Sequence, residues 1–350
     1  MSAVPAPETG PDAGAVWHFG DPLGEQRAGA AVVDRSHRAV LTLAGGERLT
    51  WLHSISSQHV SALADGATVE NLSLDGQGRV EDHWIQTDLG GVTYLDTEPW
   101  RGQPLLDFLR KMIFWADVKV EPADLAVLTV FGPDVTAATL GIDALPGPTA
   151  LPLSDGGLVR RRGADEFDLL VPRTQLSSRL EALERAGVRQ VGVWAYEARR
   201  VVALRPRLGV DTDERTIPHE VRWIGGPGEG AVHLDKGCYR GQETVARVHN
   251  LGKPPRMLVL LHLDGSADRP ATGDPVLAGG RAVGRLGTVV DHVDLGPVAL
   301  ALVKRGLPVD TELITGGDVQ VAAVIDLDSL PPADVVGAGR AAIDRLRGLA

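Results

Sequence analysis

One short segment of the chain combines a thiol, two cations and an aromatic ring with glycine. Residues 236–243 read Lys-Gly-Cys-Tyr-Arg-Gly-Gln-Glu, and Cys238 is the single cysteine among 350 residues. Cations beside a thiol favour the thiolate, which is the form that acts as nucleophile or metal ligand. Glycines let the backbone approach a ligand closely. The pattern predicts a reactive thiol, and the alternative is a turn that buries a small, inert cysteine.

Two further segments carry charges that could serve a site. Residues 76–82 place two glycines ahead of a strand that begins with neighbouring carboxylates, Glu81 and Asp82. Successive residues of a strand face opposite sides, so only one of the two can point into a site. The alternative is a surface hairpin with solvated acids. Arg200, which ends the run Glu-Ala-Arg-Arg at 197–200, is either a ligand-binding cation or half of a structural ion pair.

The sequence lacks the motifs that several other kinds of chemistry require. The chain has no GxxxxGK[ST] phosphate loop, no G-x-S-x-G nucleophile elbow and no HExxH zinc motif. His53 and His59 are six residues apart and do not share a helix face. One cysteine cannot hold an iron–sulfur cluster alone, because such clusters usually need four. The sequence therefore predicts no metal site within the chain, and any cluster would need ligands from a partner.

The composition is that of a globular protein in water. Hydrophobic residues make up 43% and charged residues 23% of the chain. The net charge of −11 argues against direct binding of nucleic acid or of an anionic membrane. The apolar stretch 298–303 is far shorter than the roughly 20 residues of a membrane span. Residues 1–14 lack the features of a secretory signal. With one cysteine and no possible intramolecular disulfide, we expect a cytoplasmic protein.

Hydrophobic periodicity predicts an α+β chain that becomes all-β in its last third. A helix is expected at 49–63, strands at 78–87 and 91–96, and a further helix beginning at Pro104. A strand at 125–131, a hairpin over 151–171 and a helix from Thr174 to Gly187 follow. From Arg256 onward, short apolar strands alternate with Gly and Pro turns, which is typical of a small antiparallel barrel.

The segment at 236–243 resembles the signature of a known family. It matches Lys-Gly-Cys-Tyr-x-Gly-Gln-Glu at every fixed position, which is the signature of the YgfZ family of folate-binding proteins, related to the glycine cleavage T-protein. Residues 244–247, 217–220, 200–209 and 274–303 resemble further stretches of these proteins. The likeness extends over roughly 30–327.

The resemblance implies a fold and a domain division. It implies a T-protein-like α+β architecture of three subdomains, two of them ferredoxin-like and the third a C-terminal antiparallel β-barrel. The boundaries expected are a disordered arm at 1–27, a first α+β subdomain at 28–66 and 125–250, a second at 67–124, the barrel at 255–328 and a tail at 329–350.

The resemblance also implies a folate site. Tetrahydrofolate would occupy a central opening in contact with Lys236, Cys238, Tyr239, Arg200 and Asp82. Lys236, Cys238 and Asp82 would be the catalytic residues, with Asp82 as counterpart of the T-protein aspartate that helps to activate the folate amine. The T-protein glutamate that grips the pterin corresponds to Val202, which cannot accept from pterin N–H groups. This departure also resembles the YgfZ branch.

The function implied is that of a folate-binding accessory protein. It would support assembly or repair of iron–sulfur clusters in client enzymes, including those that modify tRNA, with folate and these clients as partners. One alternative is a folate-dependent aminomethyltransferase or demethylase, which needs a carboxylate near the reactive folate nitrogen. Another is a non-catalytic scaffold with an inherited enzyme fold. The thiol could act as nucleophile, redox group or transient ligand.

Overall fold

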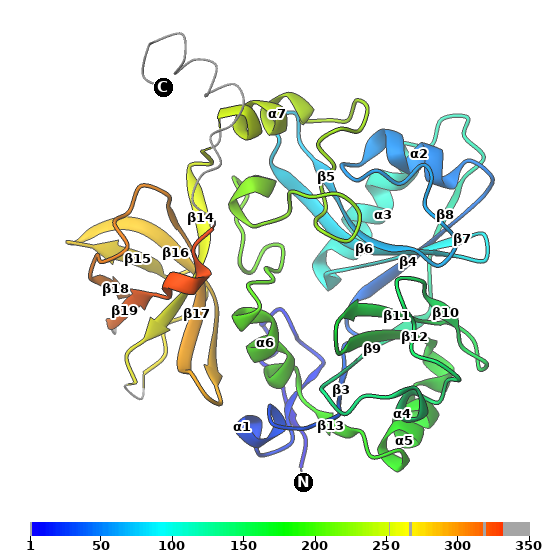
Figure 1. The fold of residues 1–350 in the computed structure, drawn as a ribbon, viewed down its shortest axis with the longest axis horizontal. Helices are drawn as coiled ribbons and strands as arrows, with labels where there is room; N and C mark the ends of the chain where they lie inside the picture. The colour runs from blue at the N-terminus through cyan, green and yellow to red at the C-terminus, as the bar shows by residue number, and fades with distance from the viewer. Residues whose placement is uncertain (1, 252, 266–267, 318–319, 332–350) are drawn as a thin grey trace. The chain divides into compact units, whose positions relative to one another are not determined.

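The computed structural model describes residues 2–251, 253–265, 268–317 and 320–331 (Figure 1). Its contacts divide the chain into two compact units. Unit 1 consists of residues Met1–Asn71 and Asp82–Glu197, and unit 2 of Leu72–Glu81 and Ala198–Ala350. Within the described residues, no helix combines the length and apolar character needed to cross a membrane.

The first sheet of unit 1 has six strands in the order β10-β11-β12-β9-β3-β13. Their bounds are β3 Ala31–Asp34, β9 Leu125–Phe131, β10 Leu151–Pro152, β11 Leu158–Gly163, β12 Glu166–Pro172 and β13 Arg189–Val191. Among the described strand pairs of this sheet, β13 and β3 alone are parallel, and the others are antiparallel. The helices α4 (Ala137–Leu140) and α5 (Leu176–Arg185) add Leu140 and Leu183 to the core of this sheet. The apolar run of β9 is buried because both of its faces are covered.

The second sheet has five strands in the order β5-β6-β7-β4-β8. Their bounds are β4 Ala39–Ala44, β5 Thr68–Leu74, β6 Val80–Leu89, β7 Val92–Thr97 and β8 Lys119–Pro122. The helices α2 (Arg48–Ile55) and α3 (Gly102–Lys111) bury Leu52, Leu105 and Leu109 with the sheet, and a short 3-10 turn, η1 (Pro99–Arg101), precedes α3. Gly90 and Gly91 both have positive φ, which the tight turn between β6 and β7 requires.

The amino-terminal region differs from the expected disordered arm. It forms β1 (Val4–Pro5), β2 (Val16–His18) and α1 (Pro22–Glu25). The fully buried carboxylate of Glu25 accepts hydrogen bonds from the backbone N–H of Phe19 at 2.7 Å and of Gly192 at 2.8 Å. These contacts join segments far apart in sequence, so the local composition could not predict this order.

The expected subdomain boundaries also differ from the sheets. Segment 28–66 is expected to lie in one subdomain, whereas β3 belongs to the first sheet and β4 with α2 packs in the second. The chain crosses between sheets at residues 35–38, where Arg35 and Arg38 are both buried. Arg35 donates to the hydroxyl groups of Thr129 and Tyr196, and Arg38 donates to the carboxylate of Asp96. Of the tail predicted at 329–350, residues 332–350 lie outside the described part of the chain.

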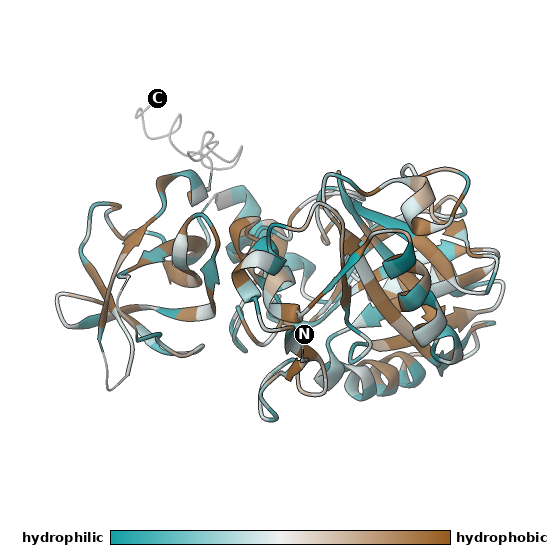
Figure 2. Ribbon diagram, turned by 90° about the horizontal axis from the view of Figure 1, so that it is seen from below, coloured by the Kyte–Doolittle hydropathy of each residue, from teal (hydrophilic) through white to brown (hydrophobic). Residues whose placement is uncertain are grey.

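Unit 2 is built around a closed antiparallel barrel. The strand order is β14-β17-β16-β15-β18-β19, with bounds β14 Arg256–Leu263, β15 Pro275–Ala278, β16 Arg281–His292, β17 Gly296–Lys304, β18 Leu313–Thr315 and β19 Val321–Ile325. Strand β14 is buried on both faces. Met257, Val259 and Leu261 belong to the barrel core, and Leu258 and Leu260 to a second core. Figure 2 shows the hydrophobic stretches along the strands. The predicted C-terminal antiparallel barrel is confirmed, while its expected bounds at 255–328 stay a prediction.

The second core of unit 2 joins the outside of the barrel to the rest of the unit. It contains Leu72, Leu74 and Val80 of the β5–β6 hairpin with Leu258 and Leu300 of the barrel. The elements between α6 (Val193–Val202) and the barrel are short: η3 (Pro218–Glu220) and α7 (Gln242–Leu251), with η4 (Leu327–Ser329) following β19. The hairpin tip and the loop before α7 are therefore fixed within one hydrophobic unit.

Candidate functional site

The signature segment forms a turn in unit 2 that leads into α7. Cys238 is exposed, whereas Lys236 is only 4% exposed. The Nζ atom of Lys236 lies 5.1 Å from the ring centre of Tyr239, within range of a cation–π contact. Burial lowers the pKa of Lys236 to about 8 and raises the pKa of Tyr239 to about 12. The turn thus presents a thiol to solvent beside a buried lysine that is partly neutral near pH 8.

Two glycines allow the β5–β6 hairpin to approach this turn closely. Gly78 and Gly241 have φ of +75° and +83°. A Cβ on Gly241 would lie 2.5 Å from the carbonyl oxygen of Asp75, and one on Gly78 would lie 2.9 Å from Cβ of Thr244. Any larger residue would force these backbones apart. The glycines of both sequence segments therefore serve contact between the segments themselves.

An ion pair joins the same two segments. Arg240 lies 3.0 Å from the carboxylate of Glu81, and both side chains are largely accessible to solvent. The next residue, Asp82, faces the other way, as strand alternation predicts, and accepts from Nε of Arg101 at 2.8 Å. Asp82 is buried and belongs to unit 1, while the signature turn belongs to unit 2. A joint role for Asp82 and Cys238 stays a prediction.

Arg200 is buried in a network inside unit 2. Its Nη1 donates to Asp211 at 2.7 Å, and its Nη2 donates to the hydroxyl of Thr288 on β16. The other oxygen of Asp211 accepts from the backbone N–H of Thr288 at 2.7 Å. These contacts connect α6 and the loop after it to the barrel, which is the structural role that the sequence left open. Contact of Arg200 with a cofactor stays a prediction.

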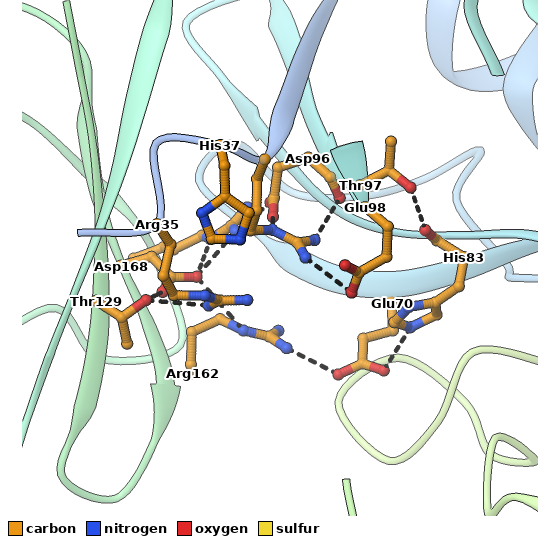
Figure 3. Close-up of polar contacts among 12 residues, drawn as sticks. Arg35, His37, Glu70, His83, Asp96, Thr97, Glu98, Thr129, Arg162 and Asp168 are labelled. Carbon is orange, nitrogen blue, oxygen red and sulfur yellow. Dashed lines mark hydrogen bonds and ion pairs between the residues drawn. The ribbon is translucent and has the colours of Figure 1, made fainter. Parts of the chain in front are cut away.

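Unit 1 contains a buried charge network that the sequence reading missed (Figure 3). Arg160 is fully buried and donates to Asp96 and, at 2.9 Å, to Asp168. Arg38 binds the other oxygen of Asp96 at 2.8 Å and Glu98 at 3.1 Å. Burial alone would raise the pKa of Asp96, but the guanidinium groups of Arg160 and Arg38 outweigh it and hold that pKa well below its usual range.

The network continues toward a partly exposed end. Glu70 bridges Arg162 at 2.8 Å and His83 at 3.0 Å, as Figure 3 shows. At the other end, the hydroxyl of Thr129 accepts from Arg35 at 3.1 Å and donates to Asp168 at 2.7 Å. Because its residues come from both sheets of unit 1, the network fixes one sheet against the other with paired charges.

One sequence signal could have revealed this network. In β11, Arg160 and Arg162 alternate and so share a face, and Asp168 is an acid inside β12, which begins with Glu166 and is otherwise apolar. The hairpin register sets Arg160 directly opposite Asp168. Alternating arginines facing one acid across a hairpin indicate a buried ion pair. Over the described ranges, no group of three or more His, Cys, Asp or Glu side chains is placed to hold a metal ion.

The fold of the chain is similar to that of a known structure. The crystal structure of the glycine cleavage system aminomethyltransferase T from Bartonella henselae superposes with a TM-score of 0.79, at 20% identity over 94% of each chain. This likeness confirms the predicted fold class, α+β with a C-terminal antiparallel barrel. Residues 256–326 match the family model described as the CAF17 C-terminal β-barrel domain.

Sequence relatives lead to the same superfamily. An aminomethyltransferase of Stenotrophomonas maltophilia (strain R551-3) is 27% identical over 334 residues, covering 83% of this chain and 87% of the relative. A chloroplastic protein of Arabidopsis thaliana, named as a transferase, is 25% identical over 283 residues, or 74% of this chain. The match spans 61% of that relative's length. The comparisons support the GcvT-like aminomethyltransferase superfamily that the signature resembles.

Proposed function

We propose that this chain is a tetrahydrofolate-binding accessory protein that supports assembly or repair of iron–sulfur clusters in client enzymes, including enzymes that modify tRNA. The observation that carries the proposal is the complete signature at 236–243, folded with Cys238 exposed beside buried Lys236 and Tyr239. The similarity to aminomethyltransferases, whose chemistry uses folate, supports the folate part. The signature, by resemblance, supports the iron–sulfur part.

The signature turn combines packed side chains with an accessible thiol. Lys236 and Tyr239 are packed and position the backbone on both sides of Cys238. A Cβ placed on Gly237 would meet no atom within 4 Å, so the backbone beside the thiol borders open space that a flat ring or a client protein could occupy. Since one thiol cannot complete a cluster, a client would supply the remaining ligands wherever Cys238 acts as a ligand.

Folate binding is tested by anaerobic titration of tetrahydrofolate into the full chain, followed by calorimetry. We expect a dissociation constant on the order of micromolar, equivalent to about −8 kcal/mol. Val202, in the position of the pterin-gripping glutamate, limits the affinity because it offers no acceptor. Absence of any heat or fluorescence change at millimolar folate would refute the folate part of the proposal.

The role of the thiol is tested by Cys238→Ala in a strain that depends on this protein. Because Cys238 is exposed, truncation should change the free energy of unfolding by less than about 1 kcal/mol. Iron–sulfur enzyme activity should nevertheless fall, since the chain holds no second cysteine. Full complementation would make the thiol dispensable and favour the scaffold alternative. A large drop in melting temperature would show a structural thiol instead.

Aminomethyl transfer is the second candidate, favoured by the fold and by the names of the relatives. It would use Asp82, which Arg101 holds in place, as the carboxylate near the reactive folate nitrogen. Transfer of a one-carbon unit to tetrahydrofolate by the wild-type chain, with loss in Asp82→Asn, would establish it. No transfer by a chain that binds folate would favour the accessory role.

A further inference from the structure

Two histidines outside the signature face each other in unit 2. His219 is the middle residue of η3, and His249 lies in the last turn of α7. The centres of their rings are 6.2 Å apart and the ring planes are inclined by 38°. His249 is exposed, whereas His219 is half-buried and both of its ring nitrogens are buried.

The ring nitrogens of His219 have no hydrogen-bond partner within the described part of the chain. Neither Nδ1 nor Nε2 of His219 has a partner among the described residues, although both atoms are buried. Buried imidazole nitrogens are normally bonded, one as donor and the other as acceptor. The nearest acid in sequence, Glu220, is held by Arg256 at 2.8 Å. Both ring nitrogens of His219 are therefore open to a ligand.

We propose that His219 and His249 together bind one divalent transition-metal ion, such as Zn²⁺, Co²⁺ or Ni²⁺, with water or an exchangeable ligand in the other positions. Imidazole is a preferred ligand of these ions. A metal–nitrogen bond of about 2.0–2.1 Å, with the nitrogen about 1.1 Å from its ring centre, sets the centres of two rings on a tetrahedral ion about 5.1 Å apart. The exposed ring of His249 would therefore move about 1 Å closer to His219 than the 6.2 Å of the structure.

The two histidines differ in how freely their rings can move. His219 lies in η3 with both ring nitrogens buried, whereas His249 is exposed near the end of α7. The exposed ring of His249 can rotate at the end of its helix to complete the coordination geometry.

A second histidine pair offers a matched control. The ring centres of His53 and His59 in unit 1 are 4.8 Å apart. The two residues do not share a helix face, but they meet because His59 lies in the loop after the end of α2. Nδ1 of His53 accepts a hydrogen bond from the backbone N–H of Val60 at 3.3 Å. Both His53 and His59 have interaction partners, unlike the buried ring nitrogens of His219, so His59→Gln should leave metal binding unchanged.

The test is isothermal titration of the full chain at pH 7.5 with ZnCl₂ and with CoCl₂. We expect one ion per chain, with binding at least about tenfold weaker in His249→Gln and in His219→Gln. His249 is exposed, so its variant reports on binding even where His219→Gln does not fold. Cys238→Ser should bind as the wild type does. Absence of binding, loss of binding in Cys238→Ser, or loss in His59→Gln would each overturn the proposal.

Discussion

Substitution Arg160→Met tests the physical account of the charge network in unit 1. It replaces a guanidinium that is 0% exposed with an apolar side chain of similar length. Asp168 then keeps the hydroxyl of Thr129 and the ion pair with Arg162 at 3.6 Å, and Asp96 keeps Arg38. Two buried carboxylates thus lose the cation that they shared, and their charges are only partly compensated.

The expected loss in the free energy of unfolding depends on the ion pairs that remain in Arg160→Met. Breaking a buried ion pair by removing one partner destabilises a protein by about 3–5 kcal/mol. Because Arg38 still compensates Asp96, we expect the lower end, about 3 kcal/mol at pH 7. The triple variant Arg160→Met, Asp96→Asn, Asp168→Asn should recover most of this loss, because it removes the uncompensated charges together with their partner.

The pH dependence has a defined sign. In the wild type the pKa of folded Asp96 is lowered, so its contribution to stability is present above the unfolded pKa of about 3.9 and is lost as pH falls through the folded value. Without Arg160 the folded pKa rises, and protonation in mild acid relieves the buried charge. The difference in stability between wild type and Arg160→Met should therefore shrink as pH falls from 7 to about 4.5.

Urea denaturation followed by circular dichroism at both pH values measures these differences. Lys119→Met is the control, because Lys119 pairs with Glu121 on the surface at 70% and 50% side-chain exposure. Its effect should stay within about 1 kcal/mol at both pH values. A cost below about 1 kcal/mol for Arg160→Met, or a cost that does not change with pH, would refute the account of the network.

Two further predictions concern the signature turn. Gly241→Ala should destabilise the chain by about 1–3 kcal/mol, because a Cβ there meets the Asp75 carbonyl at positive φ, whereas Gly76→Ala, with no atom within 4 Å, should change stability little. Equal melting temperatures of the two variants would contradict this. Competitive amine labelling of Lys236 against pH should give a midpoint near 8, as its lowered pKa requires, while a free lysine titrates near 10.4. A midpoint above 10 would show that Lys236 is solvated.

The contact between the segments of Gly78 and Gly241 shows how much of the site the local sequence could predict. The sequence indicated that both segments matter, and a ligand was the expected reason for their glycines. The structure gives another reason, since each glycine admits the backbone or side chain of the other segment. A positive φ can be anticipated from glycine in a turn, but the atom that a Cβ would meet cannot.

The sequence by itself determined features that depend on neighbours along the chain. Strand alternation placed Glu81 and Asp82 on opposite faces, and short apolar strands between Gly and Pro turns predicted the barrel. Such patterns are local because side-chain direction and turn geometry repeat every few residues.

Only the tertiary structure decided which distant side chains meet. Arg160 reaches Asp96 across 64 residues of sequence, and Glu25 caps the backbone of Gly192 across 167. His219 comes to face His249 because η3 packs against α7. None of these pairs shares an element, so no periodicity connects them. Each is fixed by the burial of sheets and helices against one another, which is a property of the whole chain.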